Sequence, residues 1–381
     1  MPGEAQSPPL RFPPVSCLLI PDSFVPMDPL THTLVGASLA ETRVGRVGLG
    51  TATCVIGANL PDIDAATYFL GGDLALGFRR GWTHGVLAMA VLPPLLAWVM
   101  HQVDRVRCSR TPAARPVPFG RLVVLAYIAV LSHPALDWMN TYGIRLLMPF
   151  DGRWFYGDAL FIVDPWVWLL LGTIVVLAHS GSRLQVAGWI ALGAIVTTLV
   201  TGVPGMPVAL RVLWCLGLAL VAGLRVWGGL QPRLPQVASV CLVLVGLYVA
   251  SMVGGAQLAR LEVAQWARDR GFEPNRIMVS PMPADPFRRD VLIADDLHYH
   301  RLTFDWLAPE RVRPRGPGTA IGDDHPAAAA ALAAPNLKGF ATWTRFPTFR
   351  IEPQDDGFRV TMTDMRFGGA VVELDGNLEP P

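Results

Sequence analysis

Charged residues are scarce in this chain of 381 residues. Asp, Glu, Lys and Arg make up 16% of the sequence, whereas hydrophobic residues make up 52%. This balance favours a polytopic membrane protein over a soluble globule. The net charge of +1 comes without a basic cluster interleaved with aromatic residues, so we expect no nucleic-acid partner.

Paired cysteines are also missing. The five cysteines are scattered without a CxxC pair, and none lies in the last third of the chain: Cys17, Cys54, Cys108, Cys215 and Cys241. This distribution argues against a disulfide scaffold and against a thiolate zinc site.

The first 26 residues lack a long apolar run. They contain seven prolines and the short apolar stretch VSCLLI, which is too brief for a signal-peptide core or a membrane span. We expect residues 1–26 to be a disordered Pro-rich extension, or the product of an upstream start codon added to a chain that naturally begins at Met27.

Apolar residues instead collect between about Gly85 and Ala256. Several of the candidate spans are shorter than the roughly 20 residues that a membrane helix needs, and we expect polar residues facing the bundle interior to complete them. The sequence therefore predicts a mainly α, polytopic helical membrane bundle over residues 27–256. The candidate spans are Gly85–Met100, Leu122–Leu136, Trp166–Ala178, Leu184–Val203, Val208–Trp227 and Gln236–Ala256.

The remainder, residues 257–381, is typical of a soluble sequence. Apolar and polar residues alternate with a period of two in RRDVLIADDLHYHRLTFDW and FRIEPQDDGFRVTMTDMRF. Such alternation predicts the strands of a small, mostly antiparallel sheet. We therefore expect a small C-terminal soluble β domain.

Arginines in the connecting segments predict the orientation, because basic residues are retained on the cytoplasmic side. Five lie between Met100 and Arg121, and counting spans onward puts three more on the same face. We therefore expect the C-terminal domain, and the segment Asp137–Pro165, on the extracytoplasmic face. The arginines are Arg105, Arg107, Arg110, Arg115 and Arg121, followed by Arg183, Arg225 and Arg233.

Four short motifs with His and Asp stand at the ends of apolar segments. They are THT with His32, PDID with Asp62 and Asp64, RRGWTHG with His84, and SHPALDWMN with His133 and Asp137. The last two residues are four apart, so a helix would place them on one face. Imidazole and carboxylate together suit zinc, manganese or iron, whereas calcium sites use oxygen ligands.

Each motif also has an ordinary structural explanation. A lone His at a segment end is usually a hydrogen-bonded residue, and Asp62 is suited to cap a helix. Ionisable groups beside membrane spans, however, are costly and usually functional. Taken together, the six residues predict a divalent-metal site, with either one metal or two.

Two arginines precede the third motif. Arg79 and Arg80 suit an anionic substrate, because guanidinium groups bind such groups through paired hydrogen bonds. An equally weighted alternative makes them interfacial anchors of the following span.

The motifs MDPLTHTLVGA, GANLPDID, RRGWTHG and SHPALDWMNTYG resemble, in order and spacing, the YdjM-like family of membrane-bound, metal-dependent hydrolases. The resemblance covers about Met27–Pro165 with specific motifs, and more loosely the later spans and the C-terminal region. One departure is Gly85, where Ser is more usual. The family is regarded as a distant relative of the zinc-dependent phospholipase C and P1 nuclease group.

This resemblance implies a bacterial inner-membrane, metal-dependent hydrolase whose substrate is poorly defined. Together with the arginine pattern, it leads us to expect an extracytoplasmic site with zinc as the favoured metal, acting on a phosphoester or lipid-linked substrate. The resemblance makes His32, Asp62, Asp64, His84, His133 and Asp137 ligands or catalytic groups. We assign proton acceptance to Asp64, with Asp62 almost as suitable. The alternatives are a non-catalytic metal-binding scaffold and an ion transporter.

Overall fold

The computed structural model describes residues 29–111 and 113–379. The expectation for residues 1–26 therefore lies outside the described residues. Two compact units emerge, one from Met27 to Ala320 and the other holding Ile321–Pro381. The predicted boundary between residues 256 and 257 falls inside a helix of the first unit.

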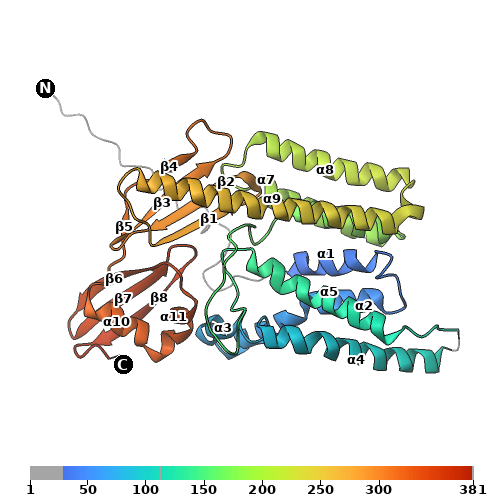
Figure 1. Cartoon of the computed structure of the whole chain (residues 1–381), viewed down its shortest axis with the longest axis horizontal. Coiled ribbons are helices and arrows are strands. Elements are labelled where there is room, and N and C mark those ends of the chain that lie inside the picture. Colours follow the sequence, from blue (N-terminus) through green and yellow to red (C-terminus); the bar gives the residue numbers. More distant parts are fainter. Residues whose placement is uncertain (1–28, 112, 380–381) are drawn as a thin grey trace. The chain divides into compact units, whose positions relative to one another are not determined.

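Helices form most of the first unit (Figure 1). The 3₁₀ segment η2 (Leu60–Leu70) connects the second and third of them. The α-helices are α1 (Pro29–Ala40), α2 (Gly50–Asn59), α3 (Gly72–Phe78), α4 (Val86–Arg110), α5 (Phe119–Trp138), α6 (Pro165–Ala178), α7 (Arg183–Thr201), α8 (Val208–Trp227) and α9 (Leu234–Arg268).

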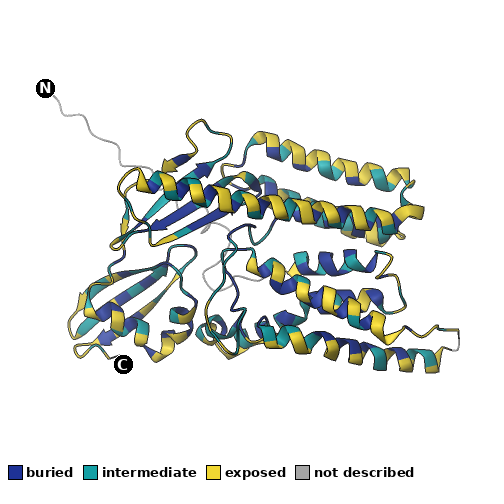
Figure 2. Ribbon diagram, viewed as in Figure 1, coloured by how far each residue is buried: buried dark blue, intermediate teal, exposed yellow. Residues whose placement is uncertain are grey.

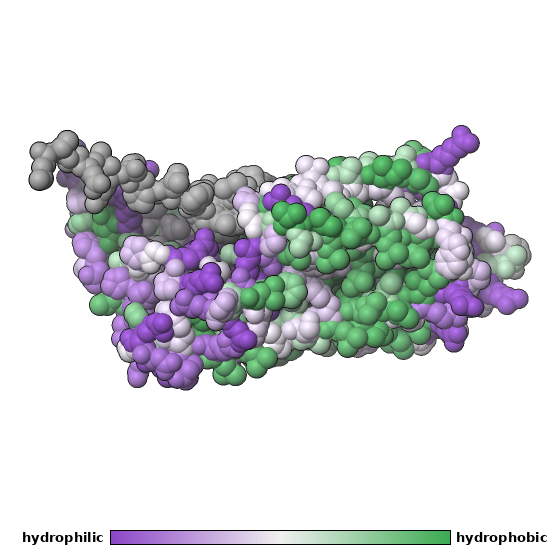
Figure 3. Space-filling view, turned by 90° about the horizontal axis from the view of Figure 1, so that it is seen from above, coloured by the Kyte–Doolittle hydropathy of each residue, from purple (hydrophilic) through white to green (hydrophobic). Residues whose placement is uncertain are grey.

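Five segments of the described chain are long and apolar enough to cross a membrane: α4, α5, α7, α8 and Gln231–Arg268, which contains α9. The outward faces of these helices are largely exposed (Figure 2), and apolar side chains gather over them (Figure 3). A bilayer covers such surface, so the predicted helical membrane bundle is confirmed. The sixth candidate span, α6, has only 14 residues.

Two helices are longer than the sequence predicted. Helix α4 continues to Arg110, so Arg105 and Arg107 lie on its last turns and not in a loop. Helix α9 has 35 residues, about 52 Å at 1.5 Å per residue, which exceeds a hydrocarbon core of about 30 Å. Its last turns therefore leave the span and pack against a β-sheet.

Small residues bring the first helices into close contact. A Cβ atom on Gly36 of α1 would lie 2.6 Å from the Cys54 carbonyl oxygen of α2. Likewise, a Cβ on Gly57 would lie 2.8 Å from the Cβ of Ala129 on α5. Such contacts let backbones approach closely, as is usual between membrane helices. The positions of α1, α2 and α5 are therefore tightly coupled.

The first sheet packs on the end of α9. Its strands are antiparallel in the order β1-β2-β3-β4, and β5 pairs with β3. Val279, Val291 and Leu302 pack against Ala259 and Val263 of α9. The strands are β1 (Arg276–Met282), β2 (Asp285–Ala294), β3 (His298–Asp305), β4 (Val312–Pro314) and β5 (Thr319–Ala320).

The segment between α5 and α6 contacts α9, and the first turn of α6 contacts the turn between β1 and β2. Arg260 of α9 pairs with the buried Asp158 at 2.9 Å, and the indole of Trp166 donates to the Ala284 carbonyl at 3.1 Å. The sheet therefore lies at the end of the bundle away from the α4–α5 connection (Figure 1).

The second unit holds another antiparallel sheet, in the order β6-β7-β8. The predicted antiparallel β structure is confirmed, but it forms two sheets, because the Pro, Gly and Ala-rich segment between β3 and β6 folds into short strands and helices. The elements are α10 (Pro326–Ala333), α11 (Lys338–Trp343), β6 (Pro347–Gln354), β7 (Gly357–Asp364) and β8 (Gly369–Asp375).

A buried aspartate organises this unit. Asp364 accepts hydrogen bonds from the Arg366 Nε at 2.8 Å, the Thr344 hydroxyl at 2.9 Å and the Arg345 amide at 2.6 Å. Burial alone would raise the pKa of Asp364, but the Arg366 charge and these hydrogen bonds lower it to about 2. The carboxylate therefore stabilises the fold when it is ionised.

Stability of the second unit is expected to fall between about pH 4 and pH 2. Because the folded-state pKa of Asp364 lies below the ordinary value of 3.8, its contribution is fully present above pH 4 and is lost as protons bind, at about 2 kcal/mol in total. Asp364→Asn should remove at least this much at neutral pH.

The free energy of opening, from hydrogen exchange of β7 amides in the full chain, measures this loss. The difference between wild type and variant should shrink toward pH 2, and the exposed control Asp355→Asn should change nothing. Equal exchange in wild type and Asp364→Asn at neutral pH would contradict the assignment.

Candidate metal centre

His32 enters the site from the first turn of α1 and is 3% exposed. Its ring stacks on that of His133 with centroids 3.8 Å apart. Its Nε2 lies 3.4 Å from Asp137 Oδ1. His32 therefore lies against the side of the cluster that the other residues form.

The PDID motif lies on η2. Helix α2 ends at Asn59, and Pro61 lies in the first positions of the tighter 3₁₀ turn, where its missing N–H is not needed. With about three residues per turn, Asp62 and Asp64 project about 120° apart. Asp62 Oδ1 faces His133 Nε2 at 3.4 Å, whereas Asp64 turns toward the segment that carries His84.

That segment depends on an unusual backbone conformation. Arg80 has φ 52°, which is uncommon for a residue other than glycine. Its N–H donates to Asp64 Oδ2 at 2.8 Å, and its carbonyl accepts from the Arg145 amide at 2.8 Å. These bonds hold the strained turn, which leads directly to His84.

His133 and Asp137 project from one face of α5, as their spacing predicts. The Nδ1 of His133 lies 2.7 Å from the Ala58 carbonyl oxygen, which can only accept a hydrogen bond. The proton of the neutral ring is therefore on Nδ1. Its Nε2 presents a lone pair to the interior of the site.

The proton of His84 is likewise on its outer nitrogen. Its Nδ1 lies 3.4 Å from Asp64 Oδ2 and 3.0 Å from the Thr83 hydroxyl oxygen. Thr83 donates its own proton to Asp64 at 2.9 Å, so its oxygen accepts from His84. Metal-ligating histidines usually donate their other ring N–H to a carboxylate in this way, so the environment of His84 suits a metal ligand.

Four electron-pair donors consequently face one another. They are His84 Nε2, His133 Nε2, Asp137 Oδ2 and Asp62 Oδ1, all within 4.8 Å of one another. Within the described chain, the two carboxylate oxygens have no hydrogen-bond partner. With both rings neutral and protonated on Nδ1, four lone pairs face one another, and this arrangement fits a bound cation.

The spacing of these atoms fits a small divalent metal. His84 Nε2 lies 3.1 Å from His133 Nε2 and 3.2 Å from Asp137 Oδ2, and His133 Nε2 lies 3.5 Å from Asp137 Oδ2. Ligands at about 2.0–2.1 Å from a tetrahedral metal would be about 3.3 Å apart. Within the described chain these four residues form one group that could hold a metal ion, and His32 lies beside the group.

Both arginines of the RRGWTHG motif are buried in the site. Arg79 lies 3.7 Å from each of Asp62 and Asp64, and its guanidinium stacks over Tyr68. Arg80 contacts Asp137 Oδ1 at 2.9 Å. At 3% and 2% exposure, neither side chain is placed to anchor a span at the membrane interface.

Arg79 and Arg80 help to keep Asp64 charged. Burial would raise the pKa of Asp64, but the hydrogen bond and charge of His84, the charge of Arg79 and the Arg80 amide hold it below its usual value. Two guanidinium groups face three carboxylates, which leaves net negative charge before a cation binds. This electrostatic balance also fits a divalent metal.

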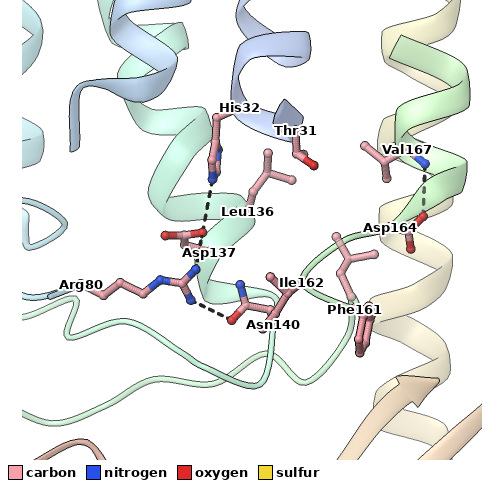
Figure 4. Close-up of a pocket in the computed structure, with 11 residues that line it drawn as sticks. Thr31, His32, Arg80, Leu136, Asp137, Asn140, Phe161, Ile162, Asp164 and Val167 are labelled. Carbon is pink, nitrogen blue, oxygen red and sulfur yellow. Dashed lines mark hydrogen bonds and ion pairs between the residues drawn. The ribbon is translucent and has the colours of Figure 1, made fainter. Parts of the chain in front are cut away.

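A small pocket adjoins the cluster (Figure 4). His32, Arg80, Asp137 and Asn140 form its polar side, with Phe161 and other apolar residues opposite. Its free volume is about 30 Å³. This space accommodates water or a small substrate group beside the cluster.

Sequence reasoning missed three residues that support the site. Thr83 holds Asp64, Asn140 accepts from Arg80 at 2.9 Å, and Arg145 fixes the turn at Arg80. Thr83 and Asn140 lie inside the motifs RRGWTHG and SHPALDWMN, so the motifs themselves carried the signal. Arg145 has no such signal, because its role is to hold a backbone carbonyl.

Residues 27–206 match the YdjM inner membrane protein family. The matched segment contains every residue of the cluster, and with the apolar helices it establishes a membrane protein. To that extent the resemblance drawn from the motifs is confirmed. The YdjM match gives no support to hydrolase activity or to a relation with phospholipase C and P1 nuclease, which stay predictions.

One curated relative is the uncharacterized protein YfhP of Bacillus subtilis (strain 168), 23% identical over 168 residues. The alignment covers 41% of this chain and 47% of YfhP, so the chain spans about half the length of this relative. No solved structure matches the chain. The geometry of the YdjM-matching segment therefore carries the functional argument.

Asp64→Asn is expected to lower the metal affinity by about 10–100-fold without unfolding the protein, because the amide cannot provide the charge that orients His84. Titration of the detergent-purified protein with Zn²⁺ against a competing chelator measures the affinity. Asp151→Asn, in the loop before α6, serves as control, since the Asp151 carboxylate bonds only to Arg153 in the described structure. Unchanged affinity in Asp64→Asn would refute this role.

Proposed function

We propose that this protein is a membrane-bound, metal-dependent hydrolase that uses activated water on a phosphoester substrate. The observation that carries the proposal is the cluster of four facing donor atoms from Asp62, His84, His133 and Asp137. A buried cluster of this kind, next to a pocket lined by an arginine, suits hydrolysis of an anionic substrate.

Three of the four residues are suited to hold the metal permanently. His84, His133 and Asp137 are buried, and their donor atoms form a triangle with sides of 3.1–3.5 Å. Asp62 is the most exposed member, with 15% of its side chain accessible. Three protein ligands with a fourth position for water are typical of catalytic zinc sites.

A divalent metal held there would supply nucleophilic water, because metal binding lowers the pKa of water from 15.7 to about 7. Asp62 lies beside the other three residues and is our candidate to accept the proton. Asp64 is less suited to that role than we expected from sequence, because its Oδ2 accepts from the Arg80 amide and the Thr83 hydroxyl and contacts His84.

Arg80 is the candidate for substrate binding. It lines the pocket, and its charge would attract a phosphoryl oxygen next to the cluster. Arg79 instead contacts Asp62 and Asp64, and its charge helps to hold the pKa of Asp64 below its usual value. The ligand set of two histidines with carboxylate favours zinc, while manganese and iron remain alternatives.

A non-catalytic scaffold is the second candidate function. It is favoured by the presence of a fourth protein donor, because a metal with four protein ligands is typical of structural sites. The two functions differ in the role of Asp62, which is a proton acceptor in one and a ligand in the other.

The proposed location of the site is the extracytoplasmic face of the membrane. The arginines Arg105, Arg107 and Arg110 lie at the end of α4 opposite His84, which precedes its first turn. Retention of these arginines in the cytoplasm would place the cluster at the other surface.

His133→Ala and Asp62→Asn are expected to separate binding from catalysis. His133→Ala should lower metal affinity by more than about 100-fold, because it removes a direct ligand and not an outer-shell partner. Asp62→Asn should keep the metal and lower the hydrolysis rate by about 10²–10⁴-fold. Elemental analysis and assays on phosphodiester, phosphomonoester and lipid substrates, with and without chelator, measure the two effects.

His101→Ala is the matched control, since this histidine on α4 contacts Phe119 and not the cluster. The scaffold function gains if Asp62→Asn loses metal as strongly as His133→Ala. Wild-type protein that binds no divalent metal would overturn both functions.

A further inference from the structure

A second cavity lies among α1, α6, α7 and α8, and it has a different chemistry from the site pocket. Its free volume is about 100 Å³. The lining is almost wholly apolar and includes Leu34, Trp168, Gly172, Trp189, Gly193 and Trp214.

The polar groups in this lining already have partners. The indole N–H groups donate at 2.6–3.1 Å to the Thr31 hydroxyl, the His179 carbonyl and the Thr197 hydroxyl, and the Thr173 hydroxyl donates to the Leu169 carbonyl at 2.7 Å. Water in a cavity needs two or more polar partners, whereas an apolar cavity of about 150 Å³ stays dry and binds benzene. The cavity is therefore suited to hydrocarbon.

Its position makes the bilayer the source of that hydrocarbon. The membrane-length helices α7 and α8 are only 11% buried over their most apolar windows. Their exposed leucine and valine side chains face outward, where acyl chains surround a membrane protein (Figure 3). The cavity lies between these helices, so a lipid chain enters it without crossing water.

The cavity and the site pocket share two walls. On α1, His32 lines the site pocket, while Leu30 and Leu34 line the apolar cavity. On α6, Val167 lines the site pocket and Trp168 the cavity. The Trp168 indole donates to the Thr31 hydroxyl at 2.6 Å, which joins these walls.

We propose that the cavity holds part of the hydrocarbon chain of a membrane lipid, and that the anionic phosphate head group of this lipid reaches the site pocket beside Arg80. This inference rests on the proposed function and narrows its substrate class to phosphate-bearing lipids. A soluble phosphoester leaves the apolar cavity empty, whereas a lipid fills both compartments at once.

Two glycines leave the space for the chain. A Cβ atom on Gly172 of α6 or Gly193 of α7 would meet no atom within 4 Å, although both residues line the cavity. A leucine at either position therefore fits the helix and projects into free volume. Gly188 on α7 also has no atom within 4 Å of its Cβ, but it is exposed and lies outside the lining, so it is the matched control.

The test uses phosphatidic acid with a diazirine in its acyl chain, incorporated in bilayer discs that contain the full-length protein. After irradiation, mass spectrometry locates the labelled peptides. In wild type and Gly188→Leu, we expect labelling on α6 and α7. Gly193→Leu and Gly172→Leu should lower it at least fivefold, while Zn²⁺ affinity and thermal stability stay at wild-type values.

Phosphatidylcholine and a diacylglycerol with the same diazirine chain distinguish the contribution of the head group. Phosphatidic acid should label the cavity at least tenfold more strongly than the diacylglycerol does. Arg80→Gln should reduce this difference. Lipid binding in the cavity would be refuted if Gly193→Leu and Gly188→Leu were labelled equally, or if labelling were confined to outer helix faces. This conclusion would hold even if the metal binds and soluble phosphoesters are hydrolysed. Glycine-sensitive labelling without bound metal would instead refute the proposed hydrolase and leave the cavity assignment in place.

Discussion

The burial of carboxylates at the end of an apolar helical bundle is the constraint on which the site depends. An ionised group removed from water is tolerated only when charges and hydrogen bonds replace its hydration. Arg79, Arg80 and the strained turn at Arg80 supply these for Asp64 and Asp137. Even so, one oxygen each of Asp62 and Asp137 stays without a hydrogen-bond partner beside two imidazole lone pairs. A divalent cation would complete the same electrostatic balance.

Helix packing sets the geometry of this cluster. Gly57 brings α2 against Ala129 of α5, and the carbonyl of the next residue, Ala58, accepts a hydrogen bond from His133. The same contact therefore fixes the distance between two helices and the tautomer of His133. Because closely packed helices do not deform continuously, a bulky residue at Gly57 would displace the ligand as well as the helix.

The polar cluster and the apolar cavity are built on opposite sides of the same short helices. Helix α1 directs His32 toward the polar site and Leu30 and Leu34 toward the cavity. Helix α6 likewise directs Val167 toward the site and Trp168 toward the cavity. This arrangement suits a reaction at a membrane surface, where the substrate has a charged end and an apolar end. The lengths of α1 and α6, 12 and 14 residues, match this position near the boundary better than a complete crossing.

By itself, the sequence determined the membrane-bundle class, the antiparallel strands and the residues that come together, because hydrophobic runs, period-two alternation and His/Asp motifs are local signals. Local signals did not predict the lengths of α4 and α9. The polar ends of these helices stay helical because they contact other segments of the chain. Only the tertiary structure distinguished the environment of Asp62 from that of Asp64. The 3₁₀ turn directs Asp62 at the donor cluster, and it directs Asp64 at the Thr83 hydroxyl and the Arg80 amide. The burial of both arginines and the apolar cavity likewise depend on helices far apart in sequence, which no motif encodes.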